Sequence, residues 1–185
     1  MATNGIVLLT PSSVAVTGSG SETATINSGG SVTFSACGSL SLNGVFSSTY
    51  DNYVIDLRYV GTGNQENLSF RLRSSGSDAT GTNYVRQALV TNSTTVSAGR
   101  NTYDSGYFGL NDSEQRSGLT GYFYGPALAQ PTAARSVSAT GDGGARTWDE
   151  AVTHSLSTAY DGITFLTTGA GVTFTGLVKV YGLVQ

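Results

Sequence analysis

Few side chains in this sequence could carry acid–base or nucleophilic chemistry. His154 is the only histidine, so a metal site built from several histidines is excluded, and a Ser–His–Asp triad has one possible base. Its polar neighbours in Val152–Ser155 favour a surface position or an inter-strand hydrogen bond. The sequence contains no Gly-x-Ser-x-Gly elbow, phosphate-binding loop or dinucleotide fingerprint. We therefore expect no catalytic residue, no metal ligand and no cofactor.

The other reactive groups also favour structural roles. Cys37 is the only cysteine, which excludes an internal disulfide, and its setting in Val32–Cys37 predicts a small buried side chain. Asp149 and Glu150 form the only adjacent acidic pair. A glycosidase needs two carboxylates about 5–9 Å apart across a cleft, whereas neighbours on a strand point to opposite faces. We expect this pair in a solvated turn.

Aromatic side chains give a stronger indication of a binding surface. Exposed Tyr and Trp on a rigid β scaffold can stack on sugar rings or anchor a protein interface; the alternative is packing between sheets. Because Tyr122 and Tyr124 flank Phe123, alternation places part of this cluster on the outside. With the apolar N-terminal segment and the C-terminal strand, the candidate interface residues are Ile6, Val7, Leu8, Leu9, Tyr103, Tyr107, Tyr122, Tyr124, Trp148 and Tyr181.

The elements that would position these side chains are strands. Two segments, Val45–Val60 from Tyr53 onward and Leu68–Ser74, show the period of two that is typical of half-buried strands. They are separated by the polar loop Gly61–Asn67 and are predicted to pair as a hairpin, which would set Asp56 beside the arginines of the second strand. The predicted inner residues are Tyr53, Ile55, Leu57, Tyr59, Leu68, Phe70 and Leu72; Ser69, Arg71 and Arg73 are predicted to point outward.

The rest of the chain indicates further short strands. Apolar runs recur about every eight to ten residues between turn-forming clusters, and only Trp148–Leu156 is a candidate for one short helix. The C-terminal run Val172–Val184 is apolar on both faces, which predicts a strand central to a sheet or covered by a partner. The fold class is therefore all-β: an antiparallel, jelly-roll-like β-sandwich of about ten strands, or a sheet closed on itself. Residues 1–12 are expected to form an N-terminal arm or short strand, and residues 13–185 a single β-sandwich domain.

Composition and charge disfavour several classes of partner. The formal net charge is −3 and the arginines are scattered, which argues against nucleic acid. No apolar run approaches the roughly 18 residues of a membrane span, and Ile6–Leu9 is too short for a signal-peptide core, so we expect cytoplasmic synthesis and no membrane partner. One Lys stands against eight Arg. A surface of hydroxyls and amides loses little side-chain entropy on contact and suits packing on a neighbour. Compositional drift is the alternative explanation for the scarcity of Lys.

Four segments resemble a known family. They are Gly5–Pro11, Ser41–Tyr53, Thr158–Ile163 and Gly176–Leu183, and the most specific parts are Phe-Ser-Ser-Thr-Tyr-Asp-Asn-Tyr at 46–53 and Gly-Leu-Val-Lys-Val-Tyr-Gly-Leu at 176–183. In this order they are similar to small virion structural proteins of tailed bacteriophages, including phages of marine bacteria and cyanobacteria. The resemblance spans nearly the whole chain. It implies a β-sandwich, usually trimeric, without enzymatic activity, and offers no catalytic motif to transfer.

The resemblance implies one of two roles in the virion. The family includes head-decoration (cement, knob or fibre) proteins and the distal domains of tail fibres. The sequence begins at Met1 and is one domain long, so we expect a capsid decoration (cement) protein that forms a homotrimer and contacts the major capsid protein or other virion proteins. The N-terminal arm and C-terminal strand would lie at these contacts. The alternative is a head- or tail-fibre module that binds a receptor or host-surface glycan; a glycan-degrading enzyme using Asp149 and Glu150 is not favoured.

Overall fold

A computed structural model of the chain describes residues 5–63, 66–113, 116–141 and 144–184. All regular structure in these ranges is β, with fourteen strands and no helix. The strands are β1 (Ile6–Leu9), β2 (Ser13–Ile26), β3 (Val32–Asn43), β4 (Asn52–Gly61), β5 (Glu66–Ser74), β6 (Ser77–Asp78), β7 (Tyr84–Asn92), β8 (Thr95–Tyr103), β9 (Gly106–Asn111), β10 (Ser117–Tyr124), β11 (Thr132–Gly141), β12 (Ala145–His154), β13 (Gly162–Thr167) and β14 (Phe174–Leu183).

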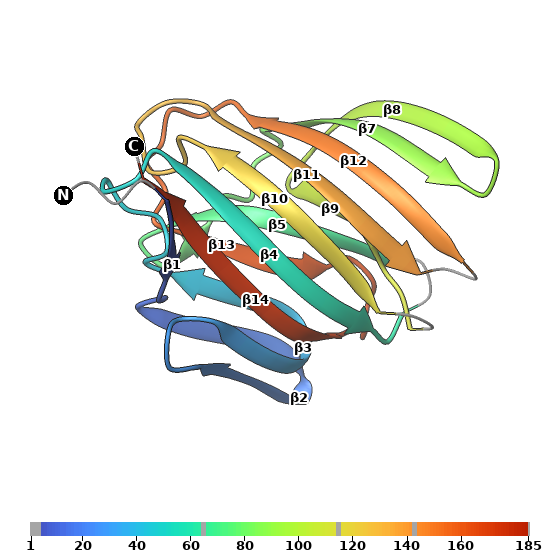
Figure 1. The fold of residues 1–185 in the computed structure, drawn as a ribbon, viewed down its shortest axis with the longest axis horizontal. Helices are drawn as coiled ribbons and strands as arrows, with labels where there is room; N and C mark the ends of the chain where they lie inside the picture. The colour runs from blue at the N-terminus through green and yellow to red at the C-terminus, as the bar shows by residue number, and fades with distance from the viewer. Residues whose placement is uncertain (1–4, 64–65, 114–115, 142–143, 185) are drawn as a thin grey trace.

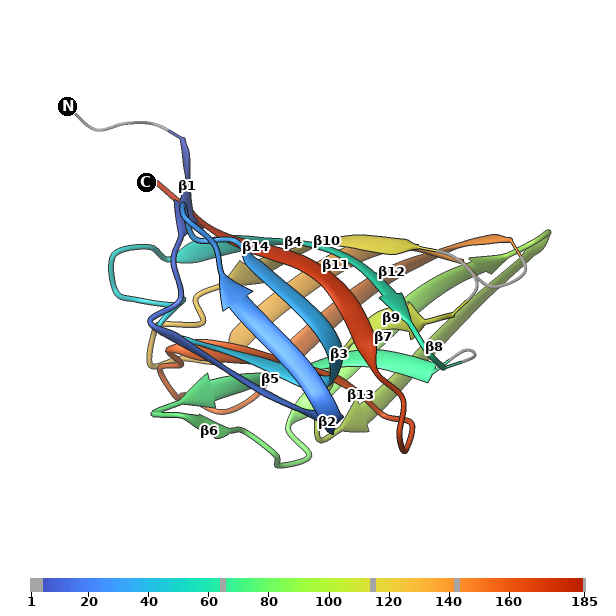
Figure 2. The ribbon, with the colours of Figure 1, turned by 90° about the horizontal axis from the view of Figure 1, so that it is seen from below.

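The strands form one antiparallel sheet that curls over, so that its two halves face each other (Figures 1 and 2). Their order is β6-β5-β13-β3-β14-β4-β10-β11-β12-β7-β8; in addition β1 pairs with β14, β2 with β3 and β9 with β5. Strands β14, β4, β10, β11 and β12 make one layer, and β5 and β13 lie beneath it (Figure 2). The predicted antiparallel, sandwich-like all-β fold is confirmed, with fourteen strands in the described ranges instead of about ten.

Alternation along the strands builds the core between the layers. The predicted inner residues of β4 and β5 are all buried: Tyr53, Ile55, Leu57, Tyr59, Leu68, Phe70 and Leu72. Aromatic rings join the two layers, because Phe70 of β5 packs against Phe123 of β10 with ring centroids 5.0 Å apart. The ring of Phe108 in β9 lies 4.7 Å from that of Phe70. These contacts make one continuous apolar core.

Two predictions about single elements are confirmed. Cys37 is buried, as its apolar setting predicts. The C-terminal strand β14 lies between β3 and β4 and is therefore central in the sheet. The backbone N–H of Val184 donates to the carbonyl of Gly5 at 3.0 Å, so the two ends of the described chain lie side by side (Figure 2).

The predicted hairpin is wrong, because β4 and β5 do not pair. β4 pairs with β10 and β14, whereas β5 pairs with β13, β6 and β9. The end of β4 is held by a distant segment, because the N–H of Gly61 donates to the carbonyl of Asp112 at 2.8 Å. Asp56 consequently pairs in register with Lys179 of β14, not with the arginines of β5.

The segment Trp148–Leu156 contains no helix and is a strand as far as His154. β12 is paired on both sides, with β11 and with β7. Asp149 and Glu150 therefore lie in the middle of a strand, and the expectation of a solvated turn is wrong. Each carboxylate pairs with an arginine from a neighbouring strand, and this pairing makes the buried position of Glu150 tolerable.

Candidate binding site on the outer face

The strand register places several predicted interface residues on one face of the sheet. Directly paired residues project on the same side, so successive pairings trace a row across the strands. Leu8 pairs with Tyr181, Tyr181 with Val54, and Val54 with Tyr122. Tyr122 pairs in turn with Arg135 on β11. This row alternates with the buried core residues, and we call the side on which it lies the outer face.

Tyr122 and Tyr124 project from the outer face two residues apart on β10. They are 44% and 45% exposed, whereas Phe123 between them is fully buried. Their strand is held between β4 and β11, so the rings stand on a central part of the sheet. A cavity of about 410 Å³ lies against them and is also lined by Arg135 and Val137. The outward tyrosine pair predicted by alternation thus borders a hollow in the surface.

Two further cavities each share a lining residue with this hollow. One, of about 330 Å³, shares Tyr124 and extends toward the loop after β10. The other, of about 390 Å³, shares Arg135 and extends over β12 toward β7 and β8. We call the three together the outer groove. Further residues that line it are Asp51, Asn52, Leu128 and Gln130 at one end and Gln87, Leu89, Ala98 and Asp149 at the other.

Arg135 and Asp149 form an ion pair in the outer groove. Arg135 Nε donates to Asp149 Oδ1 at 3.1 Å, and Nη2 donates to Oδ2 at 2.7 Å. The hydrogen bond from the guanidinium lowers the pKa of Asp149, and the same bond raises the pKa of Arg135. The side chain of Arg135 remains 60% exposed, so its guanidinium keeps N–H donors for a ligand while the two charges neutralise each other.

β7 and β8 form an arm at one end of the sheet (Figure 1). Within the described chain β8 pairs only with β7, which leaves its other backbone edge unpaired. All nine residues of β8 are exposed except Gly99, which is half-buried, and Val96 is 65% exposed. Nothing in the described chain covers either face of this strand. A two-stranded ribbon of this kind is marginally stable alone, so a covering partner would stabilise it.

A buried charged cluster lies behind β12, on the face opposite Asp149. Glu150 accepts hydrogen bonds from Arg86, with Nη2 to Oε1 at 2.5 Å and Nε to Oε2 at 3.2 Å. The guanidinium carbon of Arg86 lies 4.0 Å from the ring centre of Tyr107, which packs on Trp148 at 5.5 Å. Burial raises the pKa of Glu150 to about 7, against the opposing effect of Arg86. These aromatic rings therefore support an internal ion pair.

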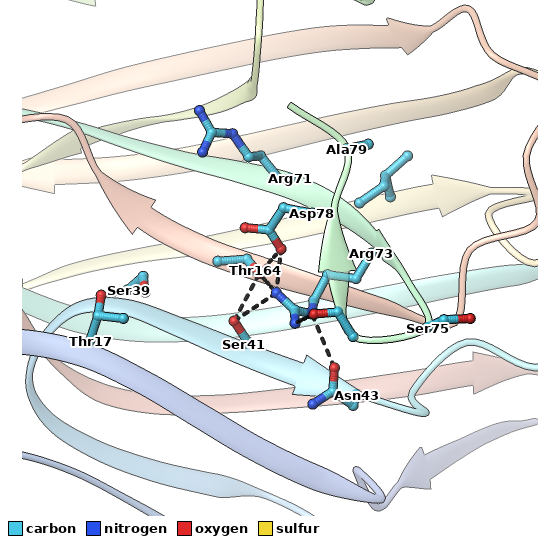
Figure 3. Close-up of polar contacts among 12 residues, drawn as sticks. Thr17, Ser39, Ser41, Asn43, Arg71, Arg73, Ser75, Asp78, Ala79 and Thr164 are labelled. Atoms are coloured by element: carbon cyan, nitrogen blue, oxygen red, sulfur yellow. Dashed lines mark hydrogen bonds and ion pairs between the residues drawn. The ribbon is translucent and has the colours of Figure 1, made fainter. Parts of the chain in front are cut away.

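A second polar cluster surrounds Arg73 on β5 (Figure 3), which is buried although alternation predicts it outside. Its Nη1 donates to Ser41 Oγ at 3.0 Å and to Thr164 Oγ1 at 2.8 Å, and also to Asp78. Its Nε donates to Asn43 Oδ1 at 3.0 Å. Because these partners come from β3, β13 and β6, the guanidinium ties four strands together. Its hydrogen-bonding capacity is largely used in doing so, which indicates a structural role.

His154 is buried, so the surface position considered for it is wrong. Its ring packs on Tyr84 with centroids 4.4 Å apart, and its Nδ1 lies 3.3 Å from the hydroxyl of Tyr160. Burial lowers its pKa, which favours the neutral imidazole. Within the described ranges, no three His, Cys, Asp or Glu residues are grouped so that they could hold a metal ion. The same described residues contain no helix that is long and apolar enough to cross a membrane.

The predicted interface residues are distributed over several places. Val7 and Leu9 project from β1 on the side opposite the outer face, and Leu9 packs against the core. Tyr103 is exposed at the end of β8. Tyr107 is buried, and with Trp148 it belongs to the cluster around Glu150, away from the outer groove. Those on the outer face are Ile6, Leu8, Tyr122, Tyr124 and Tyr181.

Several residues of these surfaces have no clear signal in the sequence. Arg135 is one of eight scattered arginines, and Val137 and Leu89 are ordinary apolar residues of short strands. They gather only because β11 pairs with β10 and β12 pairs with β7. Alternation within Ser136–Thr140 could have placed Val137 outward, but only the pairing of the strands shows which residues lie beside it.

Comparisons with known proteins identify no family for the chain. No family model matches the sequence, and a search of curated proteins finds no relative. Among solved structures the chain is similar to domain 4 of AbnA, a GH43 extracellular arabinanase from Geobacillus stearothermophilus, in complex with arabinotriose. The two share 9% identity over 94% of this chain and 83% of that chain, with a TM-score of 0.37.

Proposed function

We propose that this protein is a non-enzymatic structural protein of a tailed-phage virion, a capsid decoration (cement) protein that assembles as a homotrimer. The observation that carries the proposal is the arm formed by β7 and β8, whose edge strand is exposed on both faces. The four segments that resemble phage virion proteins support the virion context. The arm supplies a physical means of assembly, because its exposed surface becomes stable on contact with another chain.

β8 offers two kinds of contact at once. Its unpaired backbone edge can extend the sheet of a neighbour, and exposed side chains such as Val96 and Tyr103 can pack on that neighbour. Arg100 is the only charged residue of β8. The strand contains neither Lys nor Pro, the residues that commonly protect edge strands from pairing. The strand is therefore suited to docking.

β2 supplies a second edge for the same purpose. It has 14 residues, pairs only with β3 in the described chain, and carries Glu22 as its single charge. Two different edges on one chain permit head-to-tail pairing, with β8 of one copy against β2 of the next, and such pairing can close into a ring. Three copies would complete the homotrimer. The exposed Ile6 and Val7 of β1 would remain for the major capsid protein or another virion protein.

Sedimentation and shell binding test the proposal. We expect the wild type to sediment as a trimer at micromolar concentration and to co-sediment with undecorated shells of the phage that encodes it. Val96→Lys places a charge on the arm and should shift the protein toward monomer. The melting temperature of the dissociated monomer should not change. Leu156→Lys, at another exposed apolar position, should leave the trimer intact. A monomeric wild type that does not bind shells would contradict the proposal.

A further inference from the structure

We propose that the outer groove is a binding site for a linear, uncharged oligosaccharide. The inference rests on two half-exposed tyrosines beside an internally neutralised ion pair, in a depression that crosses several strands. The groove lies within one chain, and Ala98 at one end is its only lining residue on the edge strand that carries the proposed assembly.

Tyr122 and Tyr124 supply the aromatic surface. Residues two apart on a strand lie roughly 7 Å apart on the same face, so the two rings can contact neighbouring units of one chain. A tyrosine ring offers rigid apolar area and a hydroxyl, which suits a sugar with an apolar face and a polar rim. Phe123 anchors the strand between them, with its ring 5.0 Å from that of Phe70. The aromatic surface is therefore held by a rigid element before any ligand arrives.

Arg135 and Asp149 supply adjacent donors and acceptors. A sugar hydroxyl both donates and accepts, so a guanidinium beside a carboxylate can bind two neighbouring hydroxyls at once. Each group is already oriented by the other through two hydrogen bonds. Amide side chains extend the polar lining, with Gln130 at one end of the groove and Gln87 at the other.

The charge of the groove selects against acidic ligands. Among its described lining residues Arg135 is the only cation, and it is already paired with Asp149. Asp51 adds a second carboxylate at one end. A polymer of uronic acids or sulfated sugars needs unpaired Arg or Lys for recognition. An uncharged glycan needs none, and the electrostatics therefore favour it.

The shape of the groove favours an extended chain over a single sugar. Its three cavities, of about 330, 410 and 390 Å³, adjoin through Tyr124 and Arg135. The lining runs from Asn52 on β4 to Ala98 on β8, which is five strand spacings or roughly 24 Å. That length accommodates several sugar units in line.

Affinity electrophoresis in gels that contain soluble polysaccharides tests the inference. The panel consists of neutral polymers (a β-glucan, a mannan and a xylan) with alginate as the acidic comparison. We expect at least one neutral polymer to retard the wild type. Tyr122→Ala and Tyr124→Ala should each raise the dissociation constant for that polymer at least tenfold. Tyr122→Phe should retain most of the affinity. Leu156→Ala, at an equally exposed position outside both the groove and the arm, is the matched control and should bind as the wild type does.

Several outcomes would overturn the inference. These are no retardation by any neutral polymer, retardation by alginate alone, or unchanged binding in both tyrosine-to-alanine variants. Arg135→Ala provides a second test if either tyrosine variant unfolds, and full binding by this variant would also count against the site. Dissociation of the trimer by Tyr122→Ala without glycan binding by the wild type would identify the groove as a protein interface instead. Val96→Lys should lose assembly and keep its affinity per subunit, so the two proposals fail separately.

Discussion

Asp149 and Glu150, neighbours on β12, lie on opposite faces of the sheet and pair with arginines from different strands. Asp149 pairs with Arg135 of β11 on the outer face, where solvent reaches both side chains. Glu150 pairs with Arg86 of β7 in the interior and is fully buried. The same strand thus contributes one carboxylate to the outer groove and one to the core. Their electrostatic consequences are different, since solvent screens only the first pair.

Glu150 is expected to make the protein less stable as pH rises. Its pKa is raised by burial to about 7 in the folded protein from an ordinary value near 4.5. Between these values the folded state binds more protons than the unfolded state, so the free energy of unfolding falls with increasing pH, by up to about 3 kcal/mol from pH 5 to 8. Glu150→Gln removes this titration. Urea unfolding of both proteins at pH 5, 6, 7 and 8 measures the difference in slope.

His154 acts in the opposite direction and is removed from that comparison because both proteins contain it. Parallel pH profiles for the wild type and Glu150→Gln would contradict the assignment. Asp149→Asn is the control, since the neighbouring carboxylate on the outer face has a lowered pKa. Its contribution is present above the unfolded pKa and is lost only as pH falls through the folded value, below the range measured.

His154 should titrate below its ordinary range in the folded protein. Burial against Tyr84 and Tyr160 lowers its pKa, because the charged imidazolium loses solvation. As the only histidine in the chain, it gives an unambiguous ring-proton resonance in an NMR titration. We expect a midpoint below about 6.5 and a loss of stability as pH falls through that value. A midpoint at or above the ordinary value would mean that the ring is solvated or paired with an anion.

Arg73 should not tolerate replacement by lysine. Its guanidinium donates to four side chains on three other strands and to the carbonyl of Gly76. A lysine has three donors without the planar fork, so buried acceptors such as Asn43 Oδ1 lose their partner. We expect Arg73→Lys to lower the free energy of unfolding by about 2–4 kcal/mol. Arg58→Lys, at an exposed position of β4, should change it by less than about 0.5 kcal/mol, and equal losses would contradict the network.

Local sequence pattern predicts the strands and their buried faces because alternation is a property of neighbouring residues. Tyr53 to Tyr59 and the outward Tyr122 and Tyr124 follow from period alone. The pattern overlooks Glu150, because its burial depends on Arg86, which is 64 residues away in the chain. Polar side chains enter the interior only where such a partner is present.

Strand pairing is the part that sequence pattern does not predict. β4 and β5 are consecutive and both amphipathic, yet they lie in different layers because β4 pairs with β10 and β14. The outer groove depends on this non-local register, since its residues come from β4, β7, β8, β10, β11 and β12. Tyr103 and Tyr107 show the same limit: they are close in sequence, but one is exposed and the other is buried under Arg86.

A side chain at Gly106, where β9 approaches β5, should destabilise the protein. It pairs in register with Phe70, and a Cβ at this position would overlap the Phe70 ring. That ring packs against Phe108 and Phe123, with centroids 4.7 and 5.0 Å away, so a shift of the ring would disturb both contacts. We expect Gly106→Ala to lower the free energy of unfolding by about 1–3 kcal/mol through overpacking.

Gly99→Ala is the matched control, because a Cβ at Gly99 in β8 would meet nothing within 4 Å. There we expect a change of less than about 1 kcal/mol, toward greater stability. Denaturant unfolding measures the free energy of unfolding of the wild type and the two variants. A Gly106→Ala protein as stable as Gly99→Ala would show that β9 does not pack against β5 in this way.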